Sequence, residues 1–109
     1  MGIRAVLSKP LAKWVVERQR EWMYRPADAQ QRWMQRLIDD GQNTVFGRDH
    51  RLSDVRTVEE FRQAVPVRDY EDLKPYVEQI LNGDSDVLWP GKPLYLAKTS
   101  GTTSGTKYI

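Results

Sequence analysis

Residues 99–107 form a stretch rich in glycine and hydroxyl side chains, with the sequence Thr-Ser-Gly-Thr-Thr-Ser-Gly-Thr-Lys. Its two glycines, Gly101 and Gly105, permit backbone angles that other residues avoid and let a ligand approach the main chain closely. Consecutive N–H groups in such a turn can form a concave anion site, to which the hydroxyls add donors and Lys107 adds a positive charge. No acidic side chain occurs from Leu88 onward. The stretch therefore suits a polyphosphate, most simply a nucleotide.

The same composition is also typical of a flexible linker or a disordered tail. Three details argue against that interpretation: the stretch has no low-complexity repeat, it directly follows a strand pattern, and it ends in Lys-Tyr-Ile, which resembles the start of another strand. The stretch also differs from a Walker loop, which places four residues between its glycines and then Gly-Lys-Ser/Thr. Here three residues separate Gly101 from Gly105, and Thr106 precedes Lys107, so a P-loop ATPase is disfavoured.

The segment Thr-Ser-Gly-Thr-Thr-Ser-Gly-Thr-Lys-Tyr-Ile resembles the phosphate-binding signature of the adenylate-forming enzymes. It is most similar to that of the auxin-responsive acyl acid amido synthetase family. Further segments resemble this family in the right order, at residues 44–50, 57–61, 65–76 and 88–93. Members of the family are several times longer, and their acyl pocket, nucleoside contacts and C-terminal lid lie further along. The chain therefore resembles an N-terminal fragment of such an enzyme.

The resemblance implies an ATP-dependent ligase that forms an acyl adenylate from a small carboxylic acid and transfers the acyl group to an amine such as an amino acid. It implies ATP and Mg²⁺ as cofactors, because donors and a metal are needed to offset the charge on the phosphates. The residues that it assigns to phosphate binding are Thr99, Ser100, Gly101, Thr102, Thr103, Ser104, Gly105 and Lys107. It assigns no catalytic residue and no metal-ligating residue, and the 109-residue chain alone is expected to be inactive.

Upstream of the loop, hydrophobic spacing predicts mainly helices. One helix is expected over residues 9–24, and a second is expected to run to about Asp40, with Gly41 placed to end it. Residues 44–51 are expected to form a loop with Gly47 at a turn.

Two shorter helices are expected next. Thr57 and Glu60 have the spacing of a capping box, which predicts a helix that ends before Pro66. Another helix is expected to begin near Lys74, or to be kinked there, because a proline follows, and to end at Gly83.

A β-hairpin is predicted to deliver the chain to the phosphate loop. Its strands would be residues 87–89 and 94–98, joined by a turn at Pro90 and Gly91. The expected architecture is therefore α+β, an incomplete N-terminal part of an adenylate-forming large domain of the α/β class. Its parts are helices within residues 1–83, followed by strands and loop within residues 87–109.

Composition restricts the other possibilities. The chain has no cysteine, which excludes a disulfide framework or a thiol nucleophile and fits a reducing cytoplasm. No run is long enough for a membrane span, and the single histidine, His50, has no nucleophile motif near it. Two short acidic segments could suggest metal binding, Asp39-Asp40 and Asp84-Ser85-Asp86, but both lack the further ligands that a metal site needs.

Charge leaves one competing hypothesis open. The net charge of +2 is too small to imply nucleic acid, but residues 1–36 carry eight basic and three acidic side chains, a net charge of +5. This part could bind RNA or an acidic membrane surface, although charged helices are usually only solvated. We therefore expect no nucleic-acid and no membrane partner. The alternative is a non-catalytic helical fragment or a basic binding module.

Overall fold

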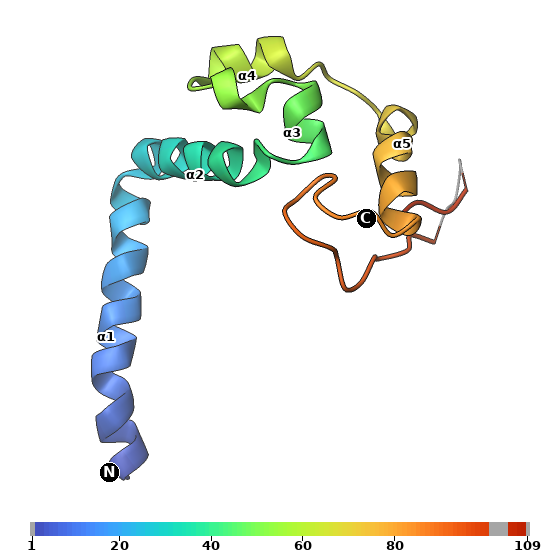
Figure 1. Ribbon diagram of the computed structural model, residues 1–109. Helices are drawn as coiled ribbons and strands as arrows, with labels where there is room; N and C mark the ends of the chain where they lie inside the picture. Colours follow the sequence, from blue (N-terminus) through green and yellow to red (C-terminus); the bar gives the residue numbers. More distant parts are fainter. Residues whose placement is uncertain (1, 101–104, 109) are drawn as a thin grey trace. The chain divides into compact units, whose positions relative to one another are not determined.

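The computed structural model describes residues 2–100 and 105–108, and its helices follow one another in chain order (Figure 1). Two compact units are distinguished, residues 1–35 and residues 36–109, and the boundary falls inside the second helix. The elements are α1 (Ile3–Tyr24), α2 (Pro26–Gly41), α3 (Val45–Asp49), the 3₁₀ helix η1 (Leu52–Asp54), α4 (Val58–Ala64) and α5 (Tyr70–Leu81).

The first unit contains α1 and the first part of α2. Helix α1 begins at Ile3, six residues before the predicted start at Lys9, and includes Pro10 in its interior. Its large apolar side chains, such as Leu11 and Trp14, are exposed within the described chain. No helix among residues 2–100 and 105–108 is long and apolar enough to cross a membrane.

The second unit has a small core around α3 and α5. The ring of Phe46 stacks on His50 at 4.1 Å between centroids and meets the edge of Tyr76 at 5.4 Å. The Tyr76 hydroxyl donates a hydrogen bond of 2.8 Å to the Asp49 carboxylate, which ties α5 to the end of α3. The buried side chains of this unit are Ile38, Thr44, His50, Leu52, Val55, Tyr76, Val77 and Val87.

The predicted loop over residues 44–51 is wrong, because residues 45–49 are the helix α3. Thr44 caps this helix: its Oγ1 accepts the Gly47 N–H at 2.9 Å and donates to the Gly41 carbonyl at 2.7 Å. Gly47 is needed for packing, since a Cβ built there would lie 2.1 Å from the Gly41 carbonyl oxygen. Gly47 was predicted to be a turn residue, whereas its missing Cβ allows α3 to lie directly against the end of α2.

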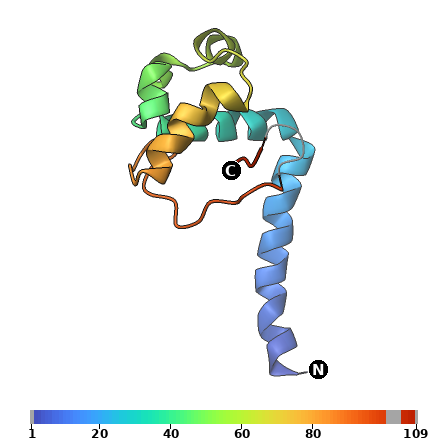
Figure 2. The ribbon, with the colours of Figure 1, turned by 90° about the vertical axis from the view of Figure 1, so that its right-hand side faces the viewer.

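The predicted β-hairpin is also wrong, and with it the α+β architecture. Figures 1 and 2 draw residues 82–100 without a strand, and the described residues contain only one isolated antiparallel bridge, between Lys98 and Tyr108. Pro90 and Pro93 have no N–H group to donate to a ladder. The described chain is therefore helical, with an irregular segment after α5.

Residues 86–91 form a compact turn in place of the hairpin. The Asp86 N–H donates to the Gly91 carbonyl at 2.9 Å, and the Gly91 N–H donates to the Asp86 carboxylate at 2.7 Å. The bond from the Gly91 N–H, followed by one from the Ser85 hydroxyl, lowers the pKa of the Asp86 carboxyl below its usual value. The carbonyls of residues 86 and 87 accept the N–H groups of residues 45 and 46 at 2.8 and 3.0 Å, which satisfies the free donors at the start of α3.

The capping box at the start of α4 is confirmed. The Thr57 Oγ1 accepts the Glu60 N–H at 3.2 Å, while the Glu60 carboxylate accepts the Thr57 N–H at 3.0 Å and the Arg56 N–H at 2.7 Å. The bond from Arg56, followed by that from Thr57, lowers the pKa of Glu60 below its ordinary 4.5. The helix ends at Ala64, before Pro66, as predicted.

We expect Glu60→Gln to lower the free energy of unfolding at neutral pH, and we expect this loss of stability to become smaller as the pH falls. Because the folded-state pKa lies below the unfolded 4.5, the carboxylate contributes its full stabilisation above that pH and loses it as the pH falls through the folded-state pKa. Urea unfolding of both proteins at neutral pH and at several values below 4.5 would measure this. Glu59→Gln is the control, because it removes a charge from the same turn without removing the capping bonds. If Glu60→Gln lowered the free energy of unfolding as much at acid pH as at neutral pH, the stabilising role of the Glu60 carboxylate would be contradicted.

Candidate functional site

The described ends of the glycine-rich loop are held together at its base. The Thr99 N–H donates to the Lys107 carbonyl at 2.8 Å, and the Lys107 N–H donates to the Thr99 Oγ1 at 3.0 Å. The Lys98–Tyr108 bridge continues this pairing outward. Two predicted site residues eight positions apart are thus brought together. We call the four paired residues 98, 99, 107 and 108 the loop neck.

The structure places only part of the predicted site. Thr99 and Lys107 are half-buried in the loop neck, and Ser100 and Gly105 are exposed beyond it. The remaining predicted residues, Gly101, Thr102, Thr103 and Ser104, lie outside the described residues. The site assignment as a whole stays a prediction.

The geometry of the described loop residues suits the binding of an anion. Gly105 has a φ of +81°, which favours glycine, and a Cβ built there would meet open space. The Thr99 hydroxyl accepts the Lys107 N–H and so keeps its own hydrogen to donate to a ligand. Two ammonium groups, those of Lys98 and Lys107, lie on residues of the loop neck, and no acidic side chain occurs between residues 88 and 108.

Tyr70, the first residue of α5, contacts the loop neck from a distant part of the sequence. Its hydroxyl oxygen accepts the Tyr108 N–H at 3.0 Å, and the Lys107 Nζ lies 5.4 Å from the centroid of its ring. Helix α5 begins here, with Asp69 as its cap, and not near Lys74 as the proline suggested. Sequence reasoning missed Tyr70, because nothing in the spacing links it to a residue 38 positions later.

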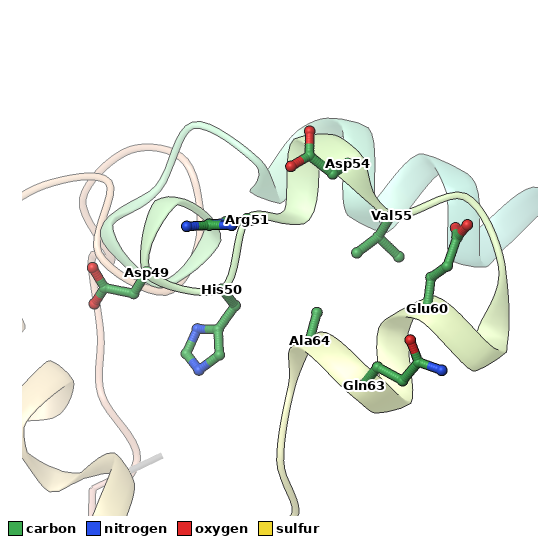
Figure 3. Close-up of a pocket in the computed structure, with 8 residues that line it drawn as sticks. All are labelled: Asp49, His50, Arg51, Asp54, Val55, Glu60, Gln63 and Ala64. Carbon is green, nitrogen blue, oxygen red and sulfur yellow. The ribbon is translucent and has the colours of Figure 1, made fainter.

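A separate cavity of about 390 Å³ lies between α3, η1 and α4 (Figure 3). The His50 ring borders it but is buried, stacked on Phe46, and bonded through Nδ1 to the Phe46 carbonyl at 2.7 Å. Two carboxylates, those of Asp49 and Glu60, already accept protein hydrogen bonds and lie on opposite sides of the view. The other residues that line the cavity are Arg51, Asp54, Val55, Gln63 and Ala64.

Around this cavity His50, Asp49 and Glu60 make packing and hydrogen-bond contacts within the fold. His50, expected to be a loop residue, is the residue that follows α3, and its ring serves packing and a backbone hydrogen bond. No group of three or more potential metal ligands occurs among the described residues. The loop neck is therefore the better candidate site.

Comparison with known proteins extends over most of the chain. Residues 15–109 match the family model described as GH3 family N-terminal domain. The chain is 29% identical over 82 residues to the probable indole-3-acetic acid-amido synthetase GH3.12 of Oryza sativa subsp. japonica, which covers 74% of this chain and 13% of that protein. It is 30% identical over 90 residues to the indole-3-acetic acid-amido synthetase GH3.2 of Arabidopsis thaliana, covering 82% of this chain and 16% of that protein.

A third relative carries a different name. The jasmonoyl-L-amino acid synthetase JAR4 of Nicotiana attenuata is 27% identical over 77 residues, which is 70% of this chain and 13% of that protein. The chain thus spans between 13% and 16% of the length of these three relatives. No solved structure gives a significant match. Since the family match begins at residue 15 and includes every residue after it, the chain belongs to the GH3 family of acyl acid amido synthetases.

Proposed function

We propose that the protein is an ATP-dependent acyl acid amido synthetase in which residues 99–107 bind the phosphates of ATP. Membership of a family whose relatives are named as amido synthetases supports the reaction class. The observation that carries the site is the pairing of Thr99 with Lys107, which brings together the two ends of the glycine-containing segment. The substrates would be a small carboxylic acid and an amine or amino acid. A cytoplasmic location is part of the proposal.

In the first step, a carboxylate oxygen would attack the α-phosphorus of ATP, and the bond from that phosphorus to the β-phosphate oxygen would break. The products are an acyl adenylate and pyrophosphate. In the second step, the nitrogen of the amine would attack the acyl carbon, AMP would leave with the bonding electrons, and the amine would lose a proton. The net product is an amide.

The contribution of this chain would be to stabilise negative charge on the phosphates. Backbone N–H groups and hydroxyls of residues 99–105 would donate to phosphate oxygens, and the Lys107 ammonium would offset the charge that accumulates on pyrophosphate. Mg²⁺ would supply further electrostatic stabilisation of the phosphates. The segment from residue 88 to residue 108 offers hydroxyl and ammonium groups and no carboxylate of its own, so the phosphate oxygens would be the main ligands of the metal ion there.

We expect the protein expressed from its complete reading frame to catalyse exchange of labelled pyrophosphate into ATP only when a suitable carboxylic acid is present. The physical reason is that the first step is reversible and needs the acid to form the adenylate. The acid panel should include indole-3-acetic acid and jasmonic acid, since relatives are named for both. Reactions without acid and reactions with a chelator of Mg²⁺ are the controls.

Absence of exchange across a broad acid panel would overturn the proposed reaction. In that case, salt-dependent binding to RNA or to anionic vesicles would support the alternative of a basic binding module, since the first 36 residues have a net charge of +5.

A further inference from the structure

We propose that Tyr70 is a positioning residue for the phosphate loop: its hydroxyl fixes the loop neck and its ring holds the Lys107 ammonium at the loop base. The inference rests on the proposed function, because the loop must bind phosphate for its position to affect the reaction. It goes further by assigning a role to a residue of α5 that lies 29 positions before Thr99.

The hydroxyl contact fixes the loop neck to a helix. The Tyr108 N–H faces the Tyr70 oxygen at 3.0 Å, directly after the residue whose N–H and carbonyl both pair with Thr99. Within residues 2–100 and 105–108 the neck belongs to no β-sheet, since its pairing is an isolated bridge. A hydrogen bond to a side chain outside the loop therefore restrains where the neck can lie.

The helix that carries Tyr70 is itself anchored in the core. Six residues later on α5, Tyr76 is buried, donates a hydrogen bond of 2.8 Å to Asp49, and contacts the Phe46 ring. The neighbouring Val77 is buried as well. Tyr70 thus ties the loop neck to a packed helix. A site supported by a rigid element is held more accurately than one on a loop alone.

The ring contact restrains Lys107 without neutralising it. Its Nζ lies 5.4 Å from the ring centroid, within the range of about 6 Å in which an ammonium is attracted to an aromatic face. Among the described residues Lys107 makes no ion pair, so its charge is not compensated by a carboxylate. A lysine held in this way has lost part of its rotamer freedom before the ligand arrives, yet still presents a full charge to a phosphate.

The test compares Tyr70→Phe and Tyr70→Leu in the protein from the complete reading frame. Tyr70→Phe removes the hydrogen bond to Tyr108 but keeps the ring, so the dissociation constant of ATP in the presence of Mg²⁺ should rise about fivefold. Tyr70→Leu removes both contacts and should raise it about twentyfold. Isothermal titration calorimetry measures binding, and pyrophosphate exchange should show the KM for ATP rising while the KM for the carboxylic acid stays unchanged.

Tyr76→Phe is the matched control. It removes the hydroxyl of a tyrosine on the same helix that also makes a hydrogen bond, but this residue contacts Asp49 and not the loop neck. We expect it to lower the thermal unfolding midpoint and to raise the dissociation constant of ATP much less than Tyr70→Phe does, because the ring of residue 76 and Val77 still pack in the core. In a Lys107→Met background, Tyr70→Leu should weaken ATP binding no more than Tyr70→Phe does, because the ammonium that the ring holds is absent.

The outcomes separate this inference from the proposed function. If the wild-type protein fails to bind ATP, the proposed function is overturned and the role of Tyr70 falls with it. If the wild type binds ATP but both Tyr70 variants bind it as tightly as Tyr76→Phe does, Tyr70 has only a structural role and the proposed function stands. If Tyr70→Leu does not fold, Tyr70→Phe decides the question.

Discussion

Gly47→Ala is expected to destabilise the protein by about 3 kcal/mol or more, the upper range for forcing an extra group into a packed site. The added Cβ would lie 2.1 Å from the carbonyl oxygen of Gly41 and 2.7 Å from that of Gln42. Both are backbone atoms, so neither can rotate away as a flexible side chain would. Relief requires α3 to move from the end of α2, which also disturbs the bond between the Gly47 N–H and the Thr44 hydroxyl.

Gly41→Ala provides the control for this measurement. Gly41 is the last residue of α2, has no positive φ, and a Cβ there would meet nothing closer than Leu52 Cδ1 at 4.0 Å. Alanine has the higher helix propensity, so this variant should be as stable as the wild type or slightly more stable. Urea unfolding of the three proteins gives the comparison. Equal stability of the two variants would show that α3 does not pack on the end of α2 as described.

The effect of Gly47→Ala should also reach the proposed phosphate site. Helix α3 ends at Asp49, whose carboxylate holds Tyr76 of α5, and α5 begins with Tyr70 at the loop neck. A shift of α3 would therefore act on the loop through α5, which contacts α3 at Tyr76 and the loop neck at Tyr70. In this way a segment with no predicted site residue would affect the loop.

Local sequence signals predicted the structure well where the contacts are local. Thr57 and Glu60 are three residues apart, and each bonds the backbone of the other, so their spacing alone defines the start of α4. The second helix also ends at Gly41, as expected. The start of α5 shows the limit of this reasoning, because the Asp69 cap sets it at Tyr70 in spite of Pro75 in the helix interior.

Sequence signals failed where the partner lies far along the chain. Helix α3 has only five residues, too few for a periodic pattern, and two of its free N–H groups bond to carbonyls some forty positions later. One of those carbonyls, that of Val87, was expected to belong to a β-hairpin, although a turn closed by Asp86 and Gly91 forms there instead. Of the candidate site, motif resemblance named Thr99 and Lys107 among eight residues, but it did not predict that they pair, and no pattern could indicate Tyr70.

The second large effect is expected for Gly105→Ala, which should lower kcat/KM for ATP in pyrophosphate exchange about a hundredfold. Gly105 has a φ of +81°, and alanine pays about 1 kcal/mol or more in that region. A Cβ there meets open space, so the variant is strained only through its backbone. The loop can relieve that strain by changing the φ of residue 105, which would misplace the phosphate donors on either side of it.

Gly91→Ala separates this functional effect from the cost of strain alone. Gly91 has a φ of +87°, and a Cβ there likewise meets nothing within 4 Å, so both variants should lose similar stability. Gly91 lies in the turn that begins at Asp86 and is not part of the loop neck. Gly91→Ala should therefore unfold at a lower urea concentration while its kcat/KM for ATP stays near the wild-type value. If the two variants instead lose activity equally, the backbone at residue 105 has no special role in binding phosphate, and the activity loss reflects stability alone.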